Sequence, residues 1–169
     1  MECEQVVFSG HAIQRMFQRG IGLDAVLAVV AQGETVAAYA DDKPYRSRLL
    51  LGFVDAKPLH VVVAFDESMG ACIVVTAYET SARTMGSGLQ DKEESMSCVI
   101  CRNGKTHNGH VTVTVQRGET TVILKRVPAE VCDNCAEYYL SSEVAAQVLE
   151  RAESAVKSGA EVEILRFAA

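Results

Sequence analysis

The chain has no tryptophan, only three prolines and no apolar run near the roughly 20 residues that a membrane-spanning helix needs. Its N-terminus, MECEQVVFSGH, lacks the basic start and the apolar centre of a secretory signal. We therefore expect a soluble, globular protein in the cytoplasm, with no membrane partner. The length of 169 residues allows one domain or two small ones.

A basic surface is also missing. Residues 1–95 carry 8 Lys and Arg against 13 Asp and Glu, and residues 96–169 carry 8 against 9. These counts give −5 and −1 of the total net charge of −6. Neither half therefore has the basic footprint of a nucleic-acid binder.

Two helices and then several strands are predicted in the first half. In residues 9–20, Ser9 can cap a helix and Gly20 can end it, and a second apolar helical pattern spans residues 23–33. Short β-branched or aromatic runs follow, separated by turns, at residues 34–40, 45–55, 58–67 and 71–79. This order predicts an α+β fold with two helices packed on an antiparallel sheet.

A second module is predicted after a break in periodicity. The glycine-, serine- and charge-rich segment 86–96 is typical of a linker between a domain at residues 1–85 and one at residues 97–169. The second domain is expected to contain two strands around the turn RGET, a helix over residues 142–157 that Ser141 can cap, and a short tail strand, EVEILRF.

Four cysteines form two C-x2-C pairs with 30 residues between them: Cys98, Cys101, Cys132 and Cys135. Two such turns can complete the tetrahedron that Zn²⁺ prefers, and the two strands between them suit a zinc ribbon. A closed site of four cysteines leaves no position for substrate, so the expected zinc is structural. The alternatives are four buried thiols or two redox pairs, and no strand–C-x2-C–helix context supports redox use.

Other possible metal ligands receive no role in this interpretation. His107 and His110 are not needed, because four cysteines already fill the site. In a reduced compartment six cysteines suggest a metal before a disulfide. Cys72 lies in an apolar strand and is expected to be a small buried residue, and Cys3 is assigned no function.

Polar side chains of the first half are candidates for catalysis. His11, Arg15 and Arg19 are spaced four residues apart, so they share one side of the first helix. His60 and Tyr78 lie within strands. Together these groups suit metal-independent RNA cleavage, which needs a base, an acid and cations at the phosphorane. The alternative is an ordinary solvated helix face and half-buried strand residues.

Residues 8–79 resemble a bacterial family of small proteins related to the RelE and MqsR toxins. The resemblance rests on FSGHAIQRMFQRGI, LLLGFVDAKPLHVVVAFDE and IVVTAYE. It implies a helix-then-sheet, RelE-like fold and, for active members, endoribonuclease activity of the mRNA interferase type. RNA is then the expected ligand of this half when it is free.

Residues 98–167 resemble the YgiT-type zinc-finger antitoxins, the class of the N-terminal domain of MqsA. The four cysteines, AEYY and the following amphipathic helix carry this resemblance. It implies a scaffold that docks on a toxin and does not use zinc for catalysis. No helix-turn-helix follows, so DNA is not expected as a partner.

The two resemblances together predict a toxin–antitoxin unit on one chain, whose halves bind each other. Met96 resembles the start of a separate antitoxin frame, so the fusion can be natural or engineered. The helix 142–157 and the tail are expected at the interface, with the tail adding a strand to the toxin-type sheet.

Other functions and assemblies stay open. The main alternative is a non-enzymatic interaction protein with a degenerate RelE-like fold and a structural zinc ribbon. A zinc-ribbon nucleic-acid binder would have to use Arg102, Lys105, Arg117, Lys125 and Arg126. Homo-oligomers are also compatible with the sequence.

Overall fold

The computed structural model describes residues 3–79 and 97–167, which form a mixed α+β fold with three helices and nine strands in one sheet. The first part contributes β1 (Gln5–Ser9), α1 (Gly10–Arg19), α2 (Leu23–Gln32), β2 (Glu34–Tyr39), β3 (Arg46–Val54), β4 (Lys57–Asp66) and β5 (Ala71–Glu79). The second part contributes β6 (Thr106–Arg117), β7 (Thr120–Cys132), β8 (Tyr138–Ser141), α3 (Ser142–Lys157) and β9 (Val162–Arg166). The predicted linker, residues 86–96, lies outside the described residues.

Helices α1 and α3 begin, and α1 ends, at the residues that the sequence indicates. Ser9 Oγ accepts a hydrogen bond from the Ala12 amide at 3.1 Å, and Gly20 ends α1 in the left-handed region at φ 67°. Ser141 Oγ accepts from the Val144 amide at 3.4 Å at the start of α3. The local capping predictions are confirmed.

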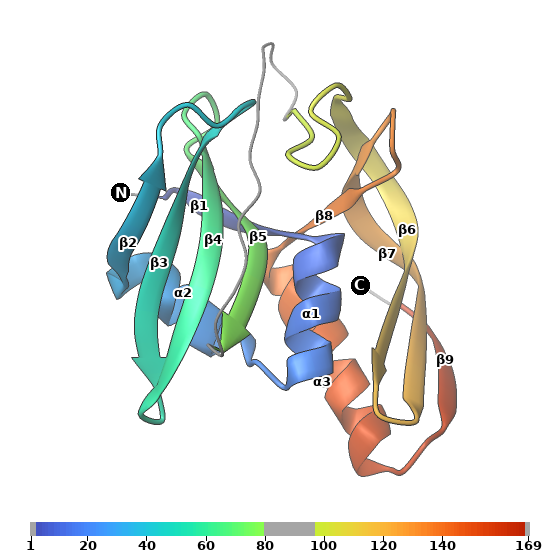
Figure 1. The fold of residues 1–169 in the computed structure, drawn as a ribbon. Coiled ribbons are helices and arrows are strands. Elements are labelled where there is room, and N and C mark those ends of the chain that lie inside the picture. Colours follow the sequence, from blue (N-terminus) through green and yellow to red (C-terminus); the bar gives the residue numbers. More distant parts are fainter. Residues whose placement is uncertain (1–2, 80–96, 168–169) are drawn as a thin grey trace.

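Two antiparallel hairpin systems form as the sequence predicts. Strands β2 to β5 pair in order as a meander, and β6 pairs with β7 across the RGET turn, where Gly118 has φ 58°. In Figure 1 these strand sets form two wings, β2–β5 on one side and β6, β7 and β9 on the other.

The wings are joined by two short strands that the sequence analysis did not predict. β1 pairs with β5 in parallel and with β8 antiparallel, so the strand order is β2-β3-β4-β5-β1-β8-β7-β6. Phe8 lies opposite Leu140 at this junction, and both side chains are fully buried. A single sheet therefore runs through both halves of the described chain.

One hydrophobic core also includes both halves. Ile13, Met16 and Phe17 of α1 are buried in a cluster that contains strand residues from both wings. Helix α1 contacts β5 and β6, and Figure 1 shows it between the wings. Helix α2 contacts β3 and β4, and α3 contacts β7, β1 and β8.

The tail forms a strand, but the predicted partner of that strand was wrong. β9 pairs in parallel with Thr121–Lys125 of β7, within its own half, and it is β8 that extends the sheet of the first half. β8 occupies only Glu130 and Val131 of β7, so the rest of that edge is free for the chain returning from α3. After α3, the tail therefore pairs with this free part of β7, a strand of its own half.

Cys3 and Cys72 form a disulfide, which the sequence analysis did not predict. Cys72 is fully buried, as expected, and lies opposite Val6 in the β1–β5 ladder. That register brings Cys3 to a Cα–Cα distance of 5.6 Å. The disulfide depends on the pairing of β1 with β5. Because β1 was not predicted from the sequence, the disulfide could not be predicted either.

No helix in the described ranges is long and apolar enough to cross a membrane.

The junction between β1 and β8 yields a stability prediction. We expect Leu140→Ala to lower the free energy of unfolding by about 2–5 kcal/mol, because it leaves a cavity beside Phe8 in the shared core. The control Phe53→Ala truncates a side chain that is 71% exposed and should change it by less than about 0.5 kcal/mol. Denaturant unfolding followed by far-ultraviolet circular dichroism measures both. Two separate transitions, only one of which shifts, would contradict a shared core.

Candidate functional site

The four predicted cysteines lie together at the base of the β6–β7 hairpin. Their sulfur atoms all lie within 4.8 Å of one another. The Sγ–Sγ distance is 3.6 Å for Cys98 with Cys135 and 3.6 Å for Cys101 with Cys132. The hairpin pairs Thr106 with Cys132, so it brings two cysteine turns that are distant in sequence to one point.

Both C-x2-C pairs adopt the same kind of turn. The Arg102 amide donates to the Cys98 carbonyl at 2.8 Å, and the Ala136 amide donates to the Cys132 carbonyl at 3.1 Å. The residue after each second cysteine is in the left-handed region, with φ 62° at Arg102 and 59° at Ala136. Each turn thus directs two sulfur atoms to the same side.

The first turn approaches the second closely at Gly104. A Cβ atom placed on Gly104 would lie 2.2 Å from Cys132 Sγ and 2.8 Å from Asn134 Cβ. The Gly104 amide also donates to Cys101 Sγ at 3.4 Å. Only glycine allows this backbone to pass so near the sulfur cluster.

The sulfur geometry fits a tetrahedral metal ion. Metal–sulfur bonds of about 2.3 Å in a tetrahedron place the sulfur atoms about 3.8 Å apart, close to the two Sγ–Sγ distances of 3.6 Å. Thiolates are soft ligands that suit transition metals. The four cysteines can therefore hold a metal ion, and they would fill all four of its positions.

This cluster is packed against the first half of the chain. Cys98 and Cys132 are buried in a second apolar cluster together with Ala64 of β4 and Ile73 of β5. Ala64 lies on the face of β4 opposite to Val61 and Val63, which are in the core with α1. The cysteine site is therefore held between the two wings.

Two tyrosines from other parts of the chain form hydrogen bonds with the first cysteine turn and with the residue just before it. Tyr139 on β8 donates its hydroxyl to Cys98 Sγ at 3.1 Å, and the same oxygen accepts from the Val99 amide at 3.1 Å. Burial, together with the adjacent Cys98 sulfur, raises the pKa of Tyr139, so the hydroxyl keeps its proton. Tyr45 of the first half accepts from the Ser97 amide at 2.6 Å.

The cysteine thiols differ in acidity. Burial acts to raise the pKa of Cys101, but hydrogen bonds from Asn134 and from the Asn103 and Gly104 amides outweigh it and lower that pKa to about 6. Burial raises the pKa of Cys98. Binding of a metal would displace the protons that remain on such sulfurs.

The predicted catalytic residues of α1 lie on its exposed side. His11 and Arg15 are exposed, and Arg15 Nη1 donates to Gln18 Oε1 at 3.0 Å. Arg19 Nη1 donates to the Ala77 carbonyl of β5 at 2.7 Å. Arg19 is therefore tied to the sheet, whereas His11 and Arg15 project away from the core.

The other two candidates form a pair elsewhere. His60 and Tyr78 are opposite each other in the β4–β5 ladder, and their rings stack with centroids 5.4 Å apart and planes at 8°. His60 alternates with Leu59 and Val61, which are buried in the core with α1. The His60–Tyr78 pair is thus on the face of β4 opposite α1, the face that also carries the cysteine site.

Comparison with known proteins gives one match. Residues 8–79 match the family model described as a domain of unknown function, DUF4258. The match begins in β1, ends with β5 and leaves out residues 97–167, which contain the four clustered cysteines. No curated protein and no solved structure matches the chain.

Tyr45, Tyr139 and Gly104 were not predicted as parts of the site. Tyr139 stands in the AEYY segment directly after the second cysteine pair, so its nearness was a local signal. Tyr45 is far away in sequence and reaches Ser97 only through the fold. The sequence offered no sign of that contact.

The two adjacent tyrosines of β8 allow a matched test. We expect Tyr139→Phe to lower the free energy of unfolding by about 1–3 kcal/mol, because the buried Cys98 sulfur and the part-buried Val99 amide lose a hydrogen-bond partner. Tyr138→Phe should be neutral or stabilising, because the Tyr138 hydroxyl is buried with no partner in the described structure. Chemical denaturation measures both variants. Equal losses for both would show that the Tyr139 hydroxyl has no special role.

Proposed function

We propose that the four-cysteine site binds Zn²⁺ and that this zinc is structural. Four sulfur ligands within 4.8 Å of one another support Zn²⁺ over the hard cations Mg²⁺ and Ca²⁺, which prefer oxygen. When bound, zinc would hold the two cysteine turns together and so fix the base of the hairpin. The four cysteines of the site are free thiols, which suits a reducing compartment, and we propose the cytoplasm. The Cys3–Cys72 disulfide would have to persist there through the complete burial of Cys72.

We further propose that the chain is a toxin–antitoxin unit in which residues 97–167 restrain residues 3–79. The observation that carries this proposal is the single sheet and core shared by both parts, with β8 pairing to β1. Such an arrangement suits permanent association rather than occasional contact. The first half would be a ribonuclease-type toxin domain with a RelE-like fold.

Contacts of α1 with the second half support restraint. The His11 amide donates to Glu137 Oε1 at 3.2 Å. The Arg117 guanidinium lies 4.5 Å from the centre of the Phe17 ring and forms an ion pair with Glu153. Both ends of the helix that carries His11, Arg15 and Arg19 are therefore contacted by residues of β6 and of the chain around β8.

The alternative function is that of a non-enzymatic interaction protein, and one observation favours it. His11 and Arg15 are on the exposed side of α1, while His60 and Tyr78 are on the opposite face of the sheet. A base and an acid must both reach one phosphodiester, so separate faces do not suit catalysis in this conformation. Under the first proposal, release from residues 97–167 would have to change this arrangement.

The zinc proposal predicts one Zn²⁺ per chain and a loss of stability when the metal is removed. Treatment with a strong chelator should lower the unfolding midpoint, and added Zn²⁺ should restore it, because metal bound only to the folded state stabilises that state. Metal analysis and thermal unfolding measure this. Cys98→Ser and Cys132→Ser should abolish the effect, whereas Cys72→Ser should keep it. A chain that purifies with iron alone would contradict the assignment.

The toxin–antitoxin proposal predicts different effects for the whole chain and its first half. Expression of residues 1–90 should arrest growth and degrade RNA, and co-expression of residues 96–169 should relieve both. The whole chain should be harmless. In the fragment, His60→Ala should abolish RNA degradation. Growth arrest that persists in this variant would then be due to general toxicity rather than to catalysis. A folded, soluble fragment that leaves growth and RNA intact would instead favour the non-enzymatic function.

A further inference from the structure

Cations gather around a shallow hollow between the end of β9 and the middle of β7. Three cations and two apolar residues line it: Lys125, Arg126, Arg166, Ile164 and Leu165. Arg151 of α3 reaches the same end of β9, because its Nη1 donates to the Arg166 carbonyl at 3.3 Å. The volume of about 330 Å³ is at the lower end of the range of small-molecule sites. The chain thus concentrates four cations here despite its net charge of −6.

No carboxylate of the described residues neutralises the cations that line the hollow. Glu161 and Glu163 belong to the same segment, but side chains alternate along a strand, so both lie on the face opposite to Ile164 and Arg166. Glu163 is beside the buried Val122 in the ladder. In the part of the chain that the structure describes, neither ion pair includes a cation of this hollow.

The arrangement of these cations lowers the stability of the fold. Lys125 and Arg166 are directly opposite each other in the β7–β9 ladder, and like charges in that position repel. Lys125 and Arg126 together oppose only Thr112 of β6, which forms a bulge, and Arg126 has φ 60°. This left-handed conformation is unfavourable for arginine and free of strain for glycine. Strain of this kind suggests that the side chain has a function.

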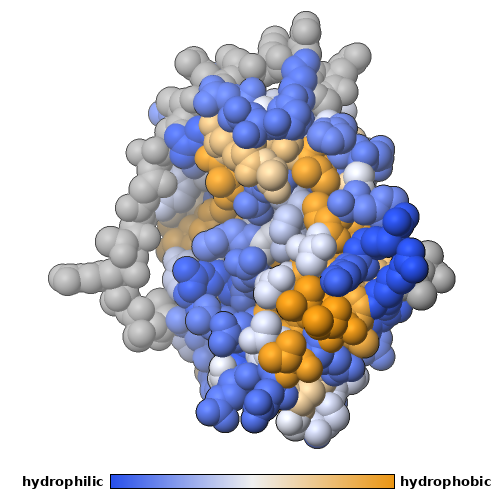
Figure 2. Space-filling view, turned by 90° about the vertical axis from the view of Figure 1, so that its right-hand side faces the viewer, coloured by the Kyte–Doolittle hydropathy of each residue, from blue (hydrophilic) through white to orange (hydrophobic). Residues whose placement is uncertain are grey.

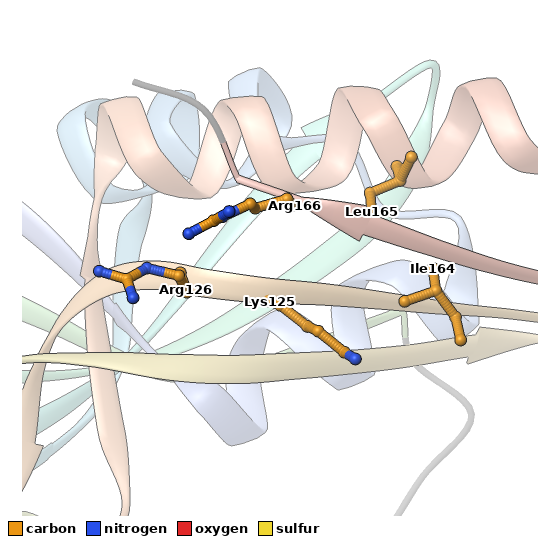
Figure 3. Close-up of a pocket in the computed structure, with 5 residues that line it drawn as sticks. All are labelled: Lys125, Arg126, Ile164, Leu165 and Arg166. Atoms are coloured by element: carbon orange, nitrogen blue, oxygen red, sulfur yellow. The ribbon is translucent and has the colours of Figure 1, made fainter.

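Two of the guanidinium groups are placed to act together. Figure 3 shows Arg126 and Arg166 extending toward the same end of the strands, whereas Lys125 extends in the other direction. Arg126 and Arg166 line the same hollow. The neighbouring Arg151 is held by the Arg166 carbonyl and by the Phe167 ring, whose centre is 4.8 Å from its guanidinium carbon. Adjacent guanidinium groups can donate several hydrogen bonds to one anion with more than one oxygen atom.

A single phosphate group matches this cluster better than a carboxylate or a nucleic-acid strand does. A terminal phosphate carries about −1.5 to −2 charges at pH 7 and three acceptor oxygens, so it can neutralise two guanidinium groups at once. A carboxylate carries one charge. A strand needs cations along its path, and Arg117, at the far end of the β6–β7 hairpin, is already paired with Glu153 and packed on Phe17.

Apolar surface adjoins the cations. Ile164 is 58% exposed and Val162 is 64% exposed, although both are large hydrophobic residues. Ile123 of β7 lies beside Ile164 in the ladder. Figure 2 shows an apolar patch on this side of the molecule with strongly hydrophilic surface directly beside it. Apolar lining next to a few converging polar groups is typical of a small-molecule site.

We propose that this hollow binds an organic phosphate with a flat, apolar body, as a mononucleotide has. Arg126 and Arg166 hold the phosphate group, Lys125 and Arg151 add to the positive potential, and the body of the ligand covers Ile164. The bound anion offsets the repulsion between the cations, so the ligand also stabilises the fold. The site lies on a different stretch of β7 from Cys132 and does not depend on the metal or on the activity of the first half.

NMR titration of the nitrogen-15-labelled full chain tests this site with AMP, adenosine and inorganic phosphate. We expect AMP to bind with a dissociation constant of about 0.1–1 mM and to shift the amide signals of residues 125–126 and 164–167. Adenosine and inorganic phosphate should each bind at least about tenfold more weakly, because each lacks one of the two parts of the ligand that the hollow contacts.

Variants separate binding from stability. Arg126→Gln and Arg166→Gln should each weaken AMP binding at least about tenfold, because each removes a charge-assisted hydrogen bond. Arg126→Gly should lose binding equally but keep or raise the thermal unfolding midpoint, since glycine adopts φ 60° without strain. Ile164→Asn should bring the affinity for AMP close to that for inorganic phosphate. The control Arg48→Gln removes an exposed arginine from β3 and should leave the affinity unchanged.

Several outcomes would overturn the proposal. These are the absence of saturable shifts with AMP up to about 10 mM, an affinity for AMP no greater than that for adenosine or inorganic phosphate, and equal binding by the Arg126→Gln and Arg166→Gln variants. A fall in the unfolding midpoint of Arg126→Gly would show that the arginine has a structural role instead. A short single-stranded RNA that binds about a hundredfold more tightly than AMP through the same arginines would assign the surface to nucleic acid.

Discussion

The buried hydroxyl of Tyr139 is the contact on which the arrangement of the two halves depends. It donates to Cys98 Sγ and accepts from the Val99 amide, so it fixes the first cysteine turn. The backbone of the same residue pairs with Ser9 of β1 and with Glu130 of β7. A hydroxyl so deeply buried must keep both partners, because an unsatisfied buried polar group is costly. The cysteine site and the strand junction therefore hold each other in place.

Ser9 links the strand junction to helix α1. Its backbone belongs to β1, and its side chain caps α1, so the direction of α1 follows from the position of β1. Helix α1 then lies between β5 and β6, and its buried face contributes to the core of both wings. Because Tyr139 contacts both the first cysteine turn and the strand junction, a metal ion held by the cysteines as proposed would also stabilise the junction.

Local signals made part of this structure predictable. The caps of α1 and α3, the β2–β5 meander and the two C-x2-C turns each depend on residues close together in sequence. β1 and β8 were missed because they have only five and four residues and are stabilised by each other rather than by their own patterns. The separation of His60 from α1 was in fact readable, because His60 alternates with the buried Leu59 and Val61.

Strand β7 contributes to the cysteine site and also pairs with β9, and these two roles fall on different stretches of the strand. Its last residues pair with β8 and supply Cys132, whereas Thr121–Lys125 carry β9. The bulge at Lys125 and Arg126 lies between these two stretches and interrupts the ladder with β6. The stretch of β7 that pairs with β9 is therefore separated from the cysteine site by a break in the regular ladder. The pairing with β9 and the pairing with β8 therefore belong to separate stretches of one strand.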